Sequence, residues 1–394
     1  MTYQEICTFE VLYNAYLEAR KRKRSKPATA QYEANVLAYT DRLSRILEGG
    51  TYQPSKFETF YVYEPKKRLV QAPAFVDKVV LHSVTDNVLY DAITRSFVRD
   101  NYASQKGKGT HDGLLRLKGA MTDYYRKHGS ADGWVLKADV HHFFASIDHD
   151  LLKQKLRSLF EKQDLDLRIY DLLCTYIDTT AGLPLGYQTS QLFALMFLDG
   201  FDHLIKEGFR IRYYGRYMDD FFIIHPDKKA LQALLREIRA QIGDLGLELN
   251  SKTAIFPLRN GIDFLGFHTY LTDTGAVVQK VRQDSIDRMK GKVRHWRKAY
   301  PAGEITKDEI IRKWQSWDAH AAHGDTYALR SKIAEQVGAI IGETLQPHRK
   351  ITAPPYVKQL RRLKQQRQLQ TPPAGNPPPA TPSEPRPDGI PPWE

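Results

Sequence analysis

The feature that most constrains this chain is a pair of adjacent carboxylates, Asp219 and Asp220, between two strongly apolar runs. Residues 209–214 are rich in aromatic and β-branched side chains, and residues 221–224 are continuously apolar, so both runs predict strands of a β-hairpin. The continuous apolar run also indicates a strand that is covered on both faces. Burying these strands places the two carboxylates together at the hairpin tip, where their charges repel each other unless a cation neutralises them.

A second acidic strand is predicted upstream. Residues 134–140 are expected to form a strand that contains Asp139, and this carboxylate together with Asp219 and Asp220 would give a nest of three carboxylates with only oxygen ligands. Mg²⁺ prefers such ligands, with waters and substrate phosphates completing its coordination. Two ions about 4 Å apart can hold the attacking and leaving oxygens of a phosphoryl transfer. The sequence therefore predicts a magnesium site for phosphoryl-transfer chemistry.

The segment Tyr217-Met218-Asp219-Asp220 resembles the catalytic motif of reverse transcriptases, and other blocks along the chain match that family in the same order. The resemblance implies an α+β, right-hand polymerase fold with fingers, a palm whose antiparallel sheet carries the hairpin, and a helical thumb. It also implies addition of deoxynucleotides to a primer 3′-OH with two Mg²⁺ ions, or Mn²⁺ in their place. The implied metal-binding residues are Asp139, Val140, Asp219 and Asp220.

The same resemblance assigns residues to nucleotide binding and proton transfer. Lys66 and Arg68, at a basic tip between two predicted strands, would bind the triphosphate, with a solvated hairpin tip as the alternative. Phe144 matches the bulky side chain that excludes a ribose 2′-OH, with core packing as the alternative. Lys252 could protonate departing pyrophosphate or serve as a surface residue. The other expected nucleotide-binding residues are Leu185, Gly186, Gln191, Tyr217 and Met218.

Two positions in the block at residues 182–191 depart from the retroviral pattern. Leu185 occupies the position of a glutamine, and Gln191 occupies that of a proline. Both departures resemble bacterial reverse transcriptases of the group II intron-like and retroelement lineage, closest to those of diversity-generating retroelements. The implied partners are a template RNA, a primer or cDNA, dNTPs and a small basic accessory protein. Two alternatives are a defence-associated or retron-like enzyme with a dedicated non-coding RNA, and a non-catalytic RNA-binding scaffold.

Composition favours a polyanionic partner. The 394 residues include 58 Lys and Arg against 46 Asp and Glu, a formal net charge of +12, and a protein that neutralises phosphates releases their counterions. A basic run at residues 21–26 favours RNA contact, with a solvated connector as the alternative. The residues expected to contact nucleic acid elsewhere are Lys106, Lys108, Arg282, Lys290, Arg294 and Arg297.

The expected organisation is a basic helical extension at 1–50, fingers and palm at 51–270, a thumb at 271–348, and a basic, then proline-rich disordered tail at 349–394. Helices are expected at 3–20, at 32–47, after Asp148 as a cap, and at 192–206 with Thr189 or Ser190 as a cap. The two cysteines and the absence of an apolar stretch of about 18 residues lead us to expect a cytoplasmic protein without a membrane segment.

Overall fold

The computed structural model describes residues 1–63 and 67–348 of the chain. A four-stranded antiparallel sheet has the order β4-β5-β3-β6, and a three-stranded antiparallel sheet has the order β7-β8-β9. The first sheet consists of β3 (Trp134–Asp139), β4 (Tyr213–Tyr217), β5 (Asp220–His225) and β6 (Ala254–Pro257). The second consists of β7 (Ile262–Phe264), β8 (Phe267–Leu271) and β9 (Val277–Val281), and a short 3₁₀ turn, η3 (Leu258–Asn260), precedes it.

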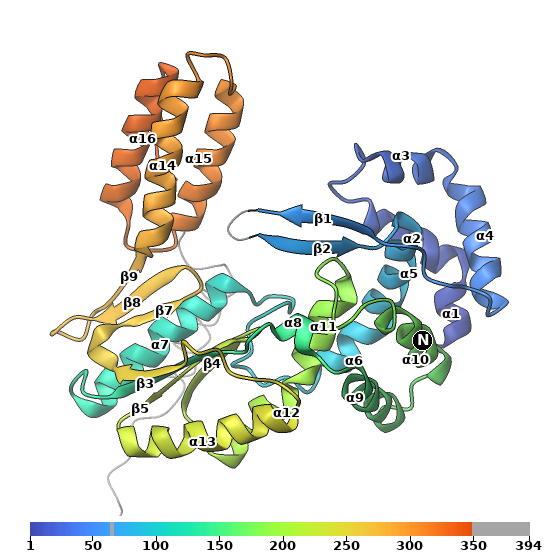
Figure 1. Ribbon diagram of the computed structural model, residues 1–394, viewed down its shortest axis with the longest axis horizontal. Coiled ribbons are helices and arrows are strands. Elements are labelled where there is room, and N and C mark those ends of the chain that lie inside the picture. Colours follow the sequence, from blue (N-terminus) through green and yellow to red (C-terminus); the bar gives the residue numbers. More distant parts are fainter. Residues whose placement is uncertain (64–66, 349–394) are drawn as a thin grey trace, which may run out of the picture.

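Strand β5 is covered on both faces, as its continuous apolar sequence predicts. Phe221 and Ile223 belong to the same core as the buried face of α13 (Lys228–Asp244). Phe222 and Ile224 belong to a separate core with the buried face of α7 (Thr110–His128). Figure 1 shows the two helices on opposite sides of the sheet. Neighbouring strand residues point to opposite faces, and burying each such side chain contributes about 1.5–3 kcal/mol.

The N-terminal part is helical and carries a projecting β-hairpin. It contains α1 (Tyr3–Cys7), α2 (Phe9–Ala19), α3 (Pro27–Ala34) and α4 (Val36–Glu48), followed by the hairpin of β1 (Glu58–Val62) and β2 (Arg68–Ala72). The helix expected at 3–20 is interrupted at Thr8, which ends α1 and caps α2 in an extended conformation. The helix expected at 32–47 is interrupted at Asn35, and its first part begins earlier, at Pro27. Helix α5 (Phe75–Val84), the π-helical turn η1 (Thr85–Leu89) and α6 (Tyr90–Thr94) follow.

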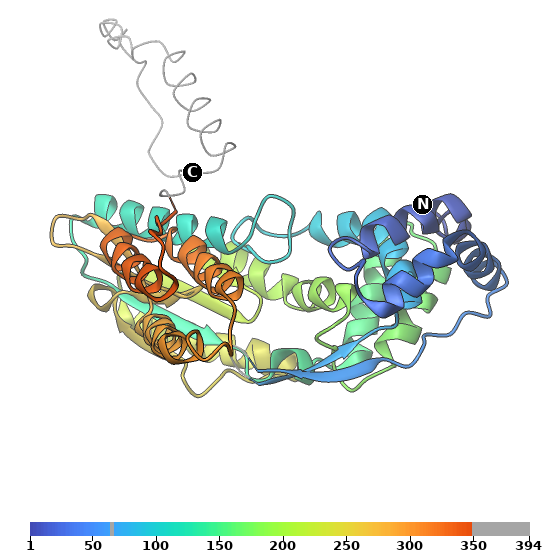
Figure 2. The same cartoon turned by 90° about the horizontal axis from the view of Figure 1, so that it is seen from above.

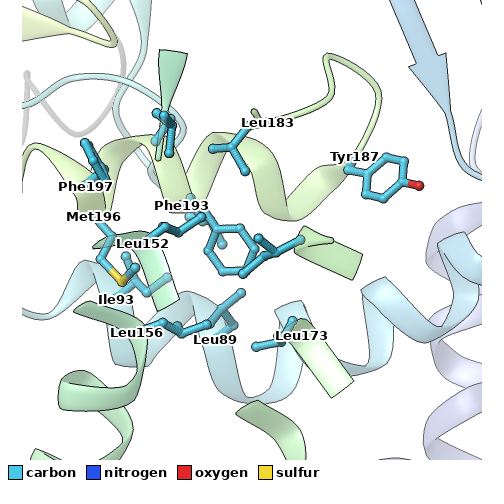
Figure 3. Close-up of a cluster of buried hydrophobic side chains, with 14 of the residues drawn as sticks. Leu89, Ile93, Leu152, Leu156, Leu173, Leu183, Tyr187, Phe193, Met196 and Phe197 are labelled. Atoms are coloured by element: carbon cyan, nitrogen blue, oxygen red, sulfur yellow. The ribbon is translucent and has the colours of Figure 1, made fainter. Parts of the chain in front are cut away.

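A group of helices packs around α11 (Gln188–Phe197) between the hairpin and the central sheet. These are α8 (Phe143–Ser146), α9 (His149–Lys162), α10 (Leu167–Ile177), α12 (Asp199–His203) and the π-helical turn η2 (Leu204–Gly208). Figure 3 shows Phe193, Met196 and Phe197 of α11 in one buried cluster with leucines of α9 and α10. Cluster members on several sides of α11 explain why that helix is apolar on nearly every face.

The two expected helix caps have different outcomes. The Asp148 carboxylate accepts a hydrogen bond from the Leu151 N–H at 2.8 Å, so its prediction as the cap of α9 is confirmed. The prediction of Thr189 or Ser190 as the cap of α11 is wrong, because Tyr187 occupies that position without a side-chain hydrogen bond. Thr189 and Ser190 instead lie buried in the first turn of α11.

The C-terminal helices form a three-helix bundle with its own core, as expected for a thumb. They are α14 (Gln283–Ala299), α15 (Lys307–Ala321) and α16 (Tyr327–Ile341), and Trp296 and Trp314 lie in their shared core. Figures 1 and 2 show this bundle and the N-terminal helices at opposite ends of the molecule. The arrangement confirms the expected right-hand fold. Lys66 and the expected tail at 349–394 lie outside the described residues.

Within the described ranges, no helix combines the length and the apolar character that crossing a membrane requires.

Candidate active site

The register of the central sheet brings the three predicted carboxylates to one end of it. Asp139, the last residue of β3, pairs across the sheet with Asp220, the first residue of β5. Asp219 lies in the turn between β4 and β5, and its carbonyl accepts a hydrogen bond from the Val140 N–H at 3.3 Å. Directly opposed residues of antiparallel strands have Cα atoms about 4.5–5.5 Å apart. Residues that are distant in sequence therefore meet at one corner of the sheet.

Electrostatic coupling links two of these carboxylates. Burial raises the pKa of the Asp219 carboxyl above its usual range, and the neighbouring Asp139 charge raises it further. The positive charges of Lys137 and Arg68 act in the opposite direction on this pKa. Asp139 and Asp219 therefore repel each other at a partly desolvated corner, which favours a cation between them.

Lys137 is a site residue that the sequence analysis missed. It lies two residues before Asp139 on the same strand, so both side chains point to the same face of the sheet. Its ammonium forms an ion pair with Asp220 and lies 5.5 Å from the centroid of the Phe264 ring. Burial lowers the pKa of Lys137 to about 8, although Asp139 and Asp219 favour its charged form. Its spacing of two residues from Asp139 could have indicated from the sequence that Lys137 lies on the same face as that carboxylate. Its ion pair with Asp220, however, follows only from the pairing of β3 with β5.

The ion pair changes the expected nest of three carboxylates. In the described part of the chain, no three His, Cys, Asp or Glu side chains are grouped so that they could hold a metal ion. In this structure the Asp220 carboxylate forms an ion pair with Lys137. Asp139 and Asp219 remain as two coupled carboxylates beside the Val140 backbone. One or two carboxylates with substrate phosphates match the way Mg²⁺ is usually bound, so this donor set fits the ion.

Four of the expected nucleotide-binding residues line one cavity of about 360 Å³. They are Phe144, Leu185, Gly186 and Gln191. Lys23, Lys78 and His82 also line this cavity, and the sequence alone did not predict that they would. Lys23 belongs to the basic run at 21–26, so that run reaches the cavity wall. Of the four other expected residues, Tyr217 and Met218 lie half-buried at the hairpin turn, Arg68 is at the start of β2, and Lys66 is outside the described residues.

Close backbone packing fixes the loop that supplies part of this cavity. A Cβ atom at Gly186 would lie 2.2 Å from the Gln71 carbonyl oxygen, so only glycine lets the loop approach β2 this closely. The Leu183 N–H donates a hydrogen bond to the Phe144 carbonyl at 2.7 Å. The loop is therefore tied both to the projecting hairpin and to the residue expected to exclude a 2′-OH.

The predicted phosphate and proton-transfer residues have distinct positions. Arg68 is exposed at the start of β2, and its charge acts on the pKa of Asp219, so it faces the carboxylate corner. Lys252 is exposed in a turn next to Asn250, whose N–H donates to the Asp139 carbonyl at 2.8 Å. The segment that carries Lys252 therefore runs along the edge of the site.

The predicted nucleic-acid contacts separate into exposed and internally bonded side chains. Lys106 is exposed, with its ammonium 4.5 Å from the Tyr90 ring centroid. Lys108 differs from the free phosphate contact that we expected, because its ammonium donates to the carbonyls of Asn101 at 2.9 Å and Arg99 at 3.3 Å. The thumb residues expected to bind nucleic acid are exposed: Arg282 before α14, and Lys290, Arg294 and Arg297 on it.

Solved structures with a similar fold include telomerases of Candida species. The telomerase of Candida albicans in complex with a TWJ fragment of telomeric RNA aligns over 74% of this chain and 60% of that chain, with 12% identity and a TM-score of 0.46. The apo telomerase of Candida tropicalis aligns over 74% of this chain and 57% of that chain, with 12% identity and a TM-score of 0.44. The chain thus spans less than two thirds of the length of these proteins.

No curated protein matches the sequence. The family model described as reverse transcriptase (RNA-dependent DNA polymerase) matches residues 64–269, which include the whole central sheet and the carboxylate corner. That match covers more than half of the 394 residues. The chain therefore belongs to the reverse transcriptase family.

Proposed function

We propose that this chain is an active RNA-directed DNA polymerase that extends a primer 3′-OH with dNTPs by two-metal catalysis. The observation that supports the proposal most directly is the register that pairs Asp139 with Asp220 and places Asp219 beside them. Repelling carboxylates at a partly desolvated corner are stabilised by positive charge, and a bound metal ion would add to the charge that Lys137 and Arg68 supply.

The proposed roles follow from the positions of the side chains. Asp139, Asp219 and the Val140 backbone would hold Mg²⁺, with Asp220 supporting them through its contact with Lys137. When bound, the metal would supply Lewis-acid activation and charge neutralisation at the reacting oxygens. Arg68, with Lys66, would bind the triphosphate as charge develops on the departing pyrophosphate. Lys252 would donate a proton to that pyrophosphate, and Phe144 would exclude a 2′-OH.

The central test is primer extension with poly-rA/oligo-dT and Mg²⁺. The wild-type chain should incorporate dTTP, and Asp219→Asn should lower the rate by about a thousandfold or more because a charged group at the reacting centre is lost. Asp148→Asn is the matched control: it also removes one carboxylate close to the site in sequence, but asparagine still caps α9. Extension that persists in a folded Asp219→Asn protein would refute the assigned role.

We further propose the diversity-generating retroelement lineage, with a template RNA, a cDNA product and a small basic accessory protein. Leu185 and Gln191 support this choice, because they are the two departures from the retroviral pattern that resemble this lineage. Both residues line the 360 Å³ cavity. We place the enzyme in the cytoplasm, since Cys7 and Cys174 are both free thiols. We also retain residues 1–50, 51–270, 271–348 and 349–394 as the proposed extension, fingers–palm, thumb and tail.

The alternative enzyme is a defence-associated or retron-like reverse transcriptase with a dedicated non-coding RNA. Its genomic neighbours separate it from the first choice: a repeat-bearing target gene with a small basic accessory gene supports the retroelement, and a lone RNA gene in a defence cluster supports the alternative. The non-catalytic scaffold is excluded if the wild-type protein extends a primer and Asp219→Asn does not.

A further inference from the structure

A fully buried ion pair joins the β4–β5 hairpin to α12. Arg216 of β4 and Asp202 of α12 each have side chains with 0% exposure. The Arg216 Nε donates to Asp202 Oδ1 at 2.7 Å, and its Nη2 donates to Asp202 Oδ2. The guanidinium therefore meets the carboxylate through two parallel hydrogen bonds, the most directional form of this pair.

The third donor of the same guanidinium reaches the catalytic turn. Arg216 Nη1 donates to the Met218 carbonyl at 2.7 Å. Met218 has a φ of 57°, in the left-handed region that is uncommon for residues other than glycine. It is the first residue of a two-residue turn between β4 and β5, where a type II′ hairpin usually has glycine. A methionine in this conformation persists only where its surroundings hold it.

Other contacts hold the two members of the pair in place. The Tyr214 hydroxyl donates to Asp202 Oδ1, and the Asn101 side-chain amide donates to Asp202 Oδ2 at 3.4 Å. The Arg216 N–H donates to the Asp100 carbonyl at 2.9 Å, and its own carbonyl accepts from the Tyr102 N–H at 3.0 Å. Hydrogen bonds therefore hold both the main chain of Arg216 and the Asp202 carboxylate that its guanidinium binds.

Stability alone gives no reason for a charged pair at this point. Replacing a buried ion pair with apolar side chains of similar volume is often neutral or stabilising, because both charges must be desolvated. Apolar residues would nevertheless offer no donor for the Met218 carbonyl. What the charged pair adds is a connection between Asp202 of α12 and the backbone carbonyl of Met218 in the turn.

We propose that Arg216 and Asp202 form a clamp that holds the left-handed backbone of Met218 and thereby positions the Asp219 carboxylate. Both are positioning residues, because they act through the turn and do not touch the reacting groups. The inference rests on the proposed polymerase function for its kinetic consequence. Its structural consequence, a turn held closed by the clamp, does not depend on activity.

The thumb contains a matched control pair. Arg330 of α16 and Asp318 of α15 are 1% and 0% exposed, and their closest atoms are 3.1 Å apart. Arg330 Nη1 also donates to a backbone carbonyl, that of His348, at 2.8 Å. This pair thus also joins a buried arginine to an aspartate and to a backbone carbonyl, but it does so through one nitrogen, Nη1, and not through two parallel bonds. Any general cost of disturbing a buried arginine should appear in both places.

The experiment compares Arg216→Lys with Arg330→Lys. Lysine keeps a positive charge for the aspartate, but its single nitrogen cannot reproduce the planar fork in which separate nitrogens reach the two carboxylate oxygens and the Met218 carbonyl. Single-turnover incorporation at saturating dNTP should fall about tenfold or more in Arg216→Lys, because a small displacement of a catalytic group lowers the chemical rate steeply. The dNTP concentration for half-maximal rate should change by less than about threefold, the pattern of a lost transition-state interaction. Arg330→Lys should keep the rate while losing a similar amount of thermal stability.

Hydrogen exchange gives a second measurement that is independent of catalysis. Amides in a peptide covering residues 213–224 should exchange faster in Arg216→Lys than in the wild type, and Arg330→Lys should leave that peptide unchanged. If the wild-type chain fails to extend a primer, the proposed function falls, and this measurement still decides about the clamp. Unchanged exchange, or rates that match in the two lysine variants, would overturn the inference.

A milder variant covers the case in which Arg216→Lys does not fold. Tyr214→Phe removes one hydroxyl from Asp202 and leaves the packing of the ring in place. It should increase exchange in the same peptide and lower the saturated rate by a few fold, about the effect of one lost hydrogen bond. A Tyr214→Phe protein with wild-type exchange and wild-type rate would overturn the clamp.

Discussion

Phe143 and Phe144 are neighbours in sequence but have different surroundings. Phe143 is 3% exposed and belongs to the main core. Phe144 packs against that core and also lines the 360 Å³ cavity. Core packing of Phe144 is therefore observed, and its place at the cavity leaves the proposed sugar selection open to test.

Phe144→Ala should admit ribonucleotides. Removing the ring opens space for a 2′-OH, so the preference for dTTP over UTP should fall by about tenfold or more, in the range set by a single shape-based contact. The measurement is the ratio of kcat/KM for the two nucleotides. Phe143→Leu is the control: it should lower thermal stability and leave the ratio intact. An unchanged ratio in Phe144→Ala would remove the sugar-selecting role.

At the scale of elements, the junction between thumb and palm contains a cluster of histidines. His111 lies in the first turn of α7, and its ring stacks on that of His323, after α15, with centroids 3.3 Å apart. His320, near the end of α15, packs against Phe267 of β8. Burial, together with the charges of His111 and His320, lowers the pKa of His323 to about 4. Protonating the cluster therefore places like charges where two parts of the fold meet.

This cluster predicts a loss of stability in mild acid. In the unfolded chain His323 takes up a proton near pH 6.5, whereas the folded protein resists protonation until about pH 4. Between these values the unfolded state binds more protons, so the free energy of unfolding falls as pH falls. Denaturant unfolding at several pH values should show a smaller decline in His323→Gln. The exposed His295 of α14 is the control position, and equal declines in both variants would contradict the prediction.

At the scale of the molecule, the net charge of +12 is distributed over several faces. Helix α14 presents Arg294 and Arg297, and α13 presents Arg236 and Arg239, all four exposed. Figure 1 shows α14 in the thumb and α13 on the other side of the central sheet. We propose that the first pair, on the thumb, contacts a bound duplex and that the second pair does not.

A salt titration tests which charges meet nucleic acid. Neutralising both thumb residues, in Arg294→Gln/Arg297→Gln, should weaken binding to a primer–template and reduce the slope of log K against log salt by about one to two. The Arg236→Gln/Arg239→Gln variant makes the same change in net charge on α13 and should leave the slope unaltered. Equal effects from the two pairs would mean that the thumb has no special contact with the duplex.

The sequence by itself determined the local features of this fold. The apolar run at 221–224 specified a strand covered on both faces, and Asp148 specified the start of α9. The resemblance to the family also led us to expect a helical thumb. These features depend on side-chain alternation and on hydrogen bonds within a few residues, so their information lies within a short stretch of chain.

Only the tertiary structure decided which polar groups meet. Lys108 turns inward to backbone carbonyls, Lys137 engages Asp220, and Arg216 joins Asp202 to the Met218 turn. No local pattern reveals such partners, because they lie on separate strands and helices that come together only when the apolar faces pack. The sequence thus predicted the acidic residues of the candidate site, while packing between distant segments decided that one of them, Asp220, pairs with Lys137.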